Sequence, residues 1–208
     1  GLQIKDSLIT AIGILQRAQT TMYKGKYEDA VPLFEKALDY FLAKHPHYYS
    51  ALAYNDLGYT WGAIGDHSRQ AESLLKAISM YEKYFPNDHA NYASSLNNLS
   101  AVYYSINDRT KAIEFARKSL ELREKTGNIN SIALCACNLS QLYINVDSAA
   151  MEKYLQLCVK RSVQTNNESR IIHSYITASV AYSHNKRYND AYQYELKAID
   201  LLEKRNTD

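Results

Sequence analysis

The fold is decided by residues 98–103, which read NLSAVY, because related stretches occur elsewhere in the chain. Residues 56–61 read DLGYTW and residues 138–143 read NLSQLY. Each stretch has a polar residue, then leucine, then a tiny residue, and an aromatic residue three positions further on. With weaker copies around Ala18 and Ser179, the tiny residues recur every 39 to 42 residues. This spacing predicts five copies of one structural unit.

A second element follows each of these stretches, and its clearest copy is YEDAVPLFEKAL at residues 27–38. Apolar residues recur at steps of three and four in both elements, which is the pattern of an amphipathic helix. Small residues in both elements allow two such helices to approach closely. The chain has only 7 glycines and 3 prolines, which favours long helices with few turns. Each unit is therefore predicted to be a pair of antiparallel helices.

We expect residues 1–208 to form a single array of such pairs. The predicted repeats cover residues 8–47, 48–88, 89–128, 129–167 and 168–208. The predicted helices cover residues 3–23, 26–44, 48–63, 67–84, 89–105, 109–126, 130–145, 147–165, 168–184 and 188–205. Two irregularities predict local distortion: Gln70 stands where an alanine is expected, and the turn at residues 145–148 is short.

The pattern resembles the tetratricopeptide repeat. The matching residues are Leu57, Gly58, Trp61, Gly65 and Ala77 in one unit, and Leu99, Ser100, Tyr103, Ala112 and Leu120 in the next. A usual unit has about 34 residues; the longer units here are similar to the kinesin-light-chain class and to repeats of bacterial signalling regulators. The resemblance implies an all-α fold, a right-handed α-solenoid of about five helix-turn-helix repeats.

In this family the first helices of successive pairs line a concave groove, so the resemblance also implies a binding surface. The residues that it places there are Gln16, Gln19, Asn55, Asp56, Tyr59, Asn97, Asn98, Tyr104, Asn138, Gln141, His173 and Thr177. Carboxamides dominate this set, and a carboxamide can both donate to and accept from a peptide backbone. The set lacks Lys and Arg, which argues against a clamp for a partner's C-terminal carboxylate.

Two interpretations of these side chains stay open at this stage. The asparagines, above all Asn98 and Asn138, either contact a ligand or tie one helix to the next. Among the aromatic residues, Tyr59 and Tyr104 are expected to be exposed, whereas the Trp61 ring is expected to be buried in the core.

Composition excludes several functional classes. The chain has 24 Lys and Arg against 22 Asp and Glu, so bulk positive charge does not drive nucleic-acid binding. No apolar run approaches the ~20 residues that cross a bilayer. We find no phosphate-binding glycine loop, no paired-histidine zinc helix and no nucleophile motif, so we expect no catalytic residue, no metal site and no cofactor.

The three cysteines are expected to be small buried hydrophobic residues without disulfides, in a reducing compartment, which favours the cytoplasm. Cys135 and Cys137 lie two apart on one predicted helix, so their side chains point to nearly opposite faces.

The leading hypothesis is a non-enzymatic module that binds a protein or peptide segment in the groove, as part of a signalling or scaffold protein. The alternative is a regulatory domain of a bacterial transcription regulator or sensor kinase that senses a peptide or small molecule. The last helix keeps an apolar edge around Leu201 and Leu202. We expect this edge to meet more chain, a partner or a second copy.

Overall fold

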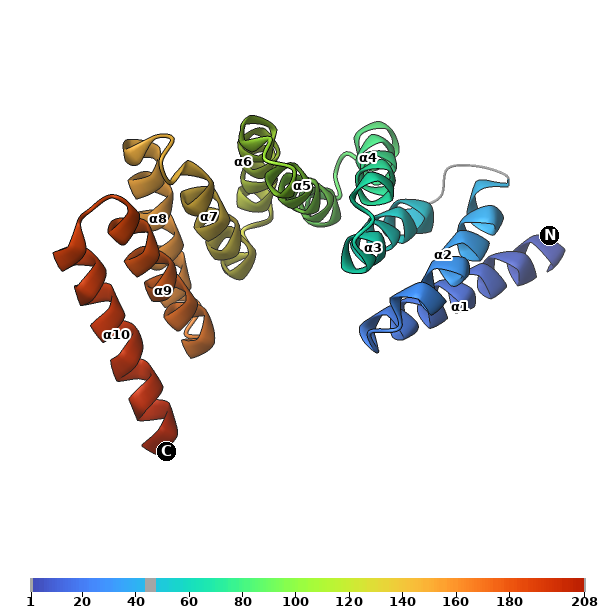
Figure 1. Ribbon diagram of the computed structural model, residues 1–208. Coiled ribbons are helices and arrows are strands. Elements are labelled where there is room, and N and C mark those ends of the chain that lie inside the picture. Colours follow the sequence, from blue (N-terminus) through green and yellow to red (C-terminus); the bar gives the residue numbers. More distant parts are fainter. Residues whose placement is uncertain (1, 44–47, 208) are drawn as a thin grey trace. The chain divides into compact units, whose positions relative to one another are not determined.

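The computed structural model describes residues 2–43 and 48–207, and these residues form ten helices and no strand (Figure 1). The predicted all-α fold of tandem helix pairs is confirmed. The chain divides into two compact units, Gly1–Ile106 and Asn107–Asp208. The helices of the first unit are α1 (Leu2–Tyr23), α2 (Tyr27–Leu42), α3 (Tyr48–Ile64), α4 (His67–Tyr84) and α5 (His89–Ser105). Those of the second are α6 (Arg109–Thr126), α7 (Ile129–Tyr143), α8 (Ser148–Gln164), α9 (Glu168–His184) and α10 (Tyr188–Thr207).

The observed helix ends lie within two residues of the predicted ones; the predicted end of the second helix at residue 44 lies outside the described residues. Side-chain caps explain this agreement, because each of the helices α4 to α9 begins after an Asp or Asn whose side chain accepts a backbone N–H of the first turn. The capping residues are Asp66, Asp88, Asp108, Asn128, Asp147 and Asn167.

Within each unit, every helix packs against the next one along the chain. The first helices of successive pairs also touch: α1 contacts α3, α3 contacts α5, and in the second unit α7 contacts α9. The core of the first unit is built around the buried Phe34, and that of the second around the buried Met151 and Leu155. These contacts bring the equivalent faces of the first helices side by side within each unit.

The small residues act as predicted where α3 meets α4. A Cβ atom added at Gly58 would lie 2.8 Å from Cγ of the buried Leu74. The irregular Gln70 also finds room here, because a Cβ atom at Gly62 would lie 2.4 Å from Nε2 of Gln70. A glycine on the first helix thus compensates for a long side chain where α2, α6 and α10 carry Ala30, Ala112 and Ala191, and the hairpin keeps its form.

The expectation that the Trp61 ring is buried in the core is met only in part. Its ring is half-buried against the core of the first unit, and the guanidinium of Arg69 lies over the ring at 4.5 Å from the centroid. The aromatic position of this repeat therefore lies at the edge of the core, where a cation covers one face of the ring.

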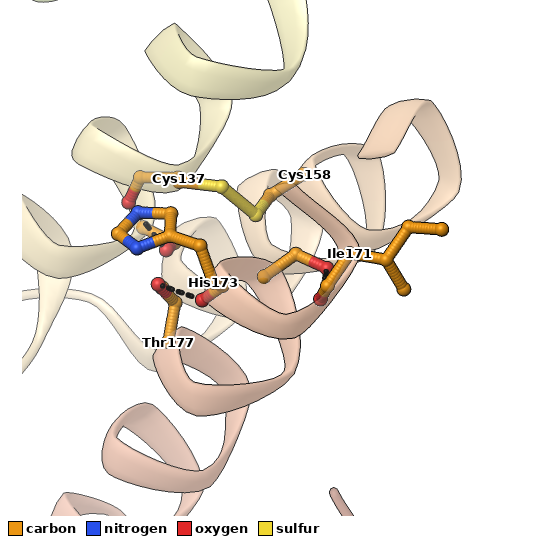
Figure 2. The surroundings of a disulfide bond; sticks show 7 residues. Cys137, Cys158, Ile171, His173 and Thr177 are labelled. Carbon is orange, nitrogen blue, oxygen red and sulfur yellow. Dashed lines mark hydrogen bonds between the residues drawn. A yellow bond between two sulfur atoms is a disulfide. The ribbon is translucent and has the colours of Figure 1, made fainter. Parts of the chain in front are cut away.

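The expectation of three unpaired cysteines is also wrong, although all three are buried. Cys137 of α7 and Cys158 of α8 form a disulfide with a Cα–Cα distance of 4.9 Å (Figure 2). Cys135 is the remaining free cysteine. Cys158 stands where α2 has Ala37 and α10 has Ala198, at the close approach of the two helices of a pair. The cysteines therefore no longer argue for a reducing compartment.

The outer face of α10 is apolar and open. Ile199 is 43% exposed and Leu202 is 40% exposed, whereas the residues in the same places on α2, Leu38 and Phe41, are buried in a core shared with α3. That this edge meets more chain, a partner or a second copy stays a prediction.

Candidate functional site

In the first unit, hydrogen bonds join predicted binding residues of three different helices. Nε2 of Gln19 on α1 donates to Oδ2 of Asp56 on α3 at 2.8 Å. On α3 itself, Nδ2 of Asn55 lies 3.4 Å from Oδ1 of Asp56. From α5, Nδ2 of Asn98 donates to Oδ1 of Asn55 at 3.3 Å. We call these four residues, Gln19, Asn55, Asp56 and Asn98, the amide row.

Within the amide row, one asparagine ties helices together, and other amides keep an atom that can contact a ligand. Asn55 serves to tie helices together, because its Oδ1 atom also accepts from the Ser95 hydroxyl at 3.0 Å and its Nδ2 atom donates to Asp56. By contrast, each amide of Gln19 and Asn98 uses only its nitrogen. Among the described residues, the side-chain carbonyl oxygens of Gln19 and Asn98 have no hydrogen-bond partner, so both can still accept from a ligand.

Asp56 gives the amide row its only charge. Burial raises the pKa of this carboxyl group above its usual value, although the hydrogen bonds from Gln19 and Asn55 pull the pKa downward. Among the described residues, no Lys, Arg or His side chain forms an ion pair with Asp56. The carboxylate is therefore only partly compensated by neutral donors.

The two predicted aromatic binding residues lie on the same helices as members of the amide row, Tyr59 on α3 and Tyr104 on α5. Tyr59 is 50% exposed and Tyr104 is 51% exposed, which confirms that both are surface residues. Tyr59 lies three residues after Asp56, so the two share a face of α3. Of the remaining predicted residues in this unit, Gln16 is exposed and Asn97 is half-buried.

The second unit has its own predicted residues, on α7 and α9. Gln141 and His173 are exposed, and Asn138 is half-buried. Thr177 is only 2% exposed, and its hydroxyl donates to the His173 carbonyl at 2.9 Å (Figure 2). This threonine thus has little surface to offer a ligand.

Two apolar residues of α9 that were not predicted as binding residues, Ile176 and Val180, are exposed. They follow His173 by three and seven residues, which is the spacing of one helix face. That spacing is the signal that could have found them.

The described residues offer no support for metal chemistry or a membrane span. Nowhere in residues 2–43 and 48–207 do three His, Cys, Asp or Glu side chains gather closely enough to hold a metal ion. No helix within these ranges combines the length and apolar character that crossing a bilayer requires.

Comparison with known proteins agrees with the architecture. Residues 71–125 match the family model of the tetratricopeptide repeat. None of the curated protein sequences gives a significant match.

Three solved structures share the fold. The kinesin light chain TPR-like repeats of Podosopora anserina are 17% identical, cover 94% of this chain and 96% of their own, and superpose with a TM-score of 0.80. The apo form of RapI is 13% identical over 95% of this chain and 72% of its own, with a TM-score of 0.85. A signal transduction ATPase with a tetratricopeptide repeat sensor from Pyrococcus horikoshii is 21% identical over 95% of this chain but only 30% of its own, with a TM-score of 0.81.

Residues 71–125 thus match the tetratricopeptide repeat, and the solved structures show that the chain shares the fold of tetratricopeptide-repeat arrays along nearly its whole length.

Proposed function

We propose that the chain is a non-enzymatic interaction module that binds an extended protein segment across α1, α3 and α5. The observation that carries this proposal is the pair of uncommitted carbonyl oxygens, on Gln19 and Asn98, at two ends of one hydrogen-bonded row. A row of acceptors that crosses three helices suits a chain whose backbone N–H groups recur at regular intervals.

The helix ties within the amide row support the same proposal. Asn55 and Asp56 hold Gln19 and Asn98 in place, so these side chains lose little further rotational freedom when a ligand arrives. The exposed ring of Tyr59 adds apolar contact area beside them. In this form the hydrogen bond to Asn98 comes from the partner's backbone, so this contact does not depend on the partner's side chains.

A regulatory role for this binding is the second candidate. The signal transduction ATPase of Pyrococcus horikoshii, which has a similar fold in 30% of its length, carries its repeats as a sensor. In that role, occupancy of the row by a peptide would rigidify the stacked helices and so be felt by an attached domain.

Selection of peptides tests the proposed function. Random linear peptides displayed on phage are selected on the immobilised chain, and the affinity of an enriched peptide is measured by fluorescence anisotropy. We expect Asn98→Ala to weaken binding by about 1–2 kcal/mol, because one hydrogen bond to the ligand is lost. Lys118→Ala on the exposed surface of α6, outside this row, is the matched control and should bind as the unchanged chain does.

The outcomes are distinct. A loss of affinity in Asn98→Ala with unchanged far-UV circular dichroism supports the proposal. Failure to enrich any peptide, or equal affinity of Asn98→Ala and Lys118→Ala, contradicts it. If Asn98→Ala lowers the melting temperature strongly, the amide is a structural tie and the carrying observation is lost.

A further inference from the structure

The amide row holds one carboxylate at a position where the other first helices carry neutral side chains. The residues at the place of Asp56 in the other repeats are Gln16, Asn98, Asn138 and Thr177. The two donors to Asp56 are neutral amides, and it makes no ion pair with any residue in the described ranges. A half-buried negative charge with only neutral partners favours an incoming cation.

The carboxylate also fixes how the neighbouring amides are turned. An ionised carboxylate can only accept hydrogen bonds, so Gln19 and Asn55 must each present their N–H groups to Asp56. The carbonyl oxygen of Asn55 then points to α5, where it accepts a hydrogen bond from Nδ2 of Asn98. The side-chain oxygens that remain uncommitted, on Gln19 and Asn98, are therefore both acceptors.

We propose that the amide row recognises the guanidinium group of an arginine, with Asp56 as its charge partner, the carbonyl oxygen of Gln19 beside it as a further acceptor, and the Tyr59 ring as a stacking surface. The inference deepens the proposed function and rests on it, because the arginine belongs to the bound protein segment.

Arginine, lysine and acidic side chains differ in how well they fit the amide row. A guanidinium has five N–H donors and no acceptor, which matches a set made of acceptors. A lysine ammonium has three donors and stacks less well on an aromatic ring, so it should bind more weakly. An acidic side chain would meet the Asp56 carboxylate with a like charge and should be rejected.

Tyr59 supplies the stacking partner that a guanidinium needs. The ring is 50% exposed and lies one helical turn from Asp56 on α3. A planar cation can thus contact the carboxylate and the ring face together. The same chain shows this arrangement elsewhere, since the guanidinium of Arg187 lies 4.4 Å from the Tyr182 ring centroid and also pairs with Glu152.

Defined pentapeptides test the inference. The probes are acetyl-Ala-Ala-X-Ala-Ala-amide with arginine, citrulline, lysine or glutamate at X, together with free N-acetylarginine amide, titrated by NMR at millimolar concentration. Citrulline keeps the shape of arginine and removes its charge. The variants are Asp56→Asn, Tyr59→Ala and Asp200→Asn. Asp200 lies on α10 and bonds to Lys204, so its change alters net charge equally but outside the amide row.

We expect the arginine peptide to bind about tenfold more tightly than the citrulline peptide. This ratio should fall to about one in Asp56→Asn, decrease in Tyr59→Ala and persist in Asp200→Asn. The arginine peptide should also lower the pKa of the Asp56 carboxyl group, and the citrulline peptide should not. That readout needs no variant, so it decides the question even if Asp56→Asn fails to fold.

Equal binding of the arginine and citrulline peptides, or an arginine preference that survives in Asp56→Asn, overturns the inference. Equal affinity for free N-acetylarginine amide also overturns it, because the site would then read a small guanidinium compound. The proposed function fails separately: if a selected peptide depends on Asn98 but its affinity is unchanged in Asp56→Asn, only the arginine inference falls.

Discussion

Replacement of Gly58 by alanine probes the close approach of α3 and α4, on which the repeat depends. The added Cβ atom would lie 2.8 Å from Cγ and 3.0 Å from Cδ2 of Leu74, and 3.3 Å from the carbonyl oxygen of Gln70. Leu74 is fully buried, and the carbonyl belongs to the backbone of α4. Neither neighbour can move away without disturbing the hairpin.

Two effects of opposite sign set the size of the change. Alanine is favoured over glycine in a helix by about 1 kcal/mol, whereas overpacking a core costs about 1–3 kcal/mol. Because the contact is with buried and backbone atoms, the cost should lie in the upper part of that range. We therefore expect Gly58→Ala to lower the free energy of unfolding by about 1–2 kcal/mol.

Gly13→Ala in α1 is the matched control, since an added Cβ atom there meets nothing within 4 Å. This variant should raise the free energy of unfolding by about 1 kcal/mol through helix propensity alone. Urea denaturation followed by circular dichroism at 222 nm measures both variants. If Gly58→Ala is as stable as Gly13→Ala, the close approach of α3 and α4 is not the constraint that keeps this position small.

Three further predictions concern the core, the disulfide and the carboxylate. Phe34→Ala should lower the free energy of unfolding by about 3–5 kcal/mol, because Phe34 is fully buried. If Phe34→Ala loses less stability than Gly58→Ala in the same urea titration, Phe34 is not central to the core of the first unit. Reduction of the Cys137–Cys158 bond, which joins residues 21 apart, should cost about 3 kcal/mol, and Cys158→Ala should remove the difference between melts with and without reductant. Asp56→Asn should gain stability relative to the unchanged chain as pH rises from about 4 to 7. Burial raises the pKa of Asp56 in the folded chain, so the cost of burying its charge is absent at low pH and complete above that pKa. A stability difference between Asp56→Asn and the unchanged chain that stays constant across this range would refute the raised pKa.

Helix positions could be predicted closely from the sequence because their signals are local. The apolar period of each helix lies within one segment, and caps such as Asp66 and Asp108 mark the beginnings directly. The small residues at the centre of each pair could be predicted for the same reason, since one spacing repeats along the chain.

Contacts between elements could not be derived in the same way. Cys137 and Cys158 lie on different helices, and the positions of two residues on one helix, such as Cys135 and Cys137, do not determine which residue of the neighbouring helix lies opposite. The burial of Trp61 depends on where Arg69 of the next helix lies, and that was not visible in the repeat pattern.

For the candidate site, too, features within one helix could be predicted and contacts between helices could not. The resemblance named Gln19, Asn55, Asp56 and Asn98, which hydrogen bonds do join, and the sequence predicted that Tyr59 is exposed. It could not say that Asn55 is committed to ties between helices while Asn98 keeps a carbonyl oxygen open, because the partner of each amide depends on the rotation of the neighbouring helix.

A double-mutant cycle tests whether Asn98 contacts the backbone of a bound segment. One arm is Asn98→Ala; the other replaces single backbone N–H groups of the selected peptide by N-methyl groups, one position at a time. We predict one position at which the two changes are coupled by about 1 kcal/mol or more. Strict additivity at every position of the peptide would contradict the account.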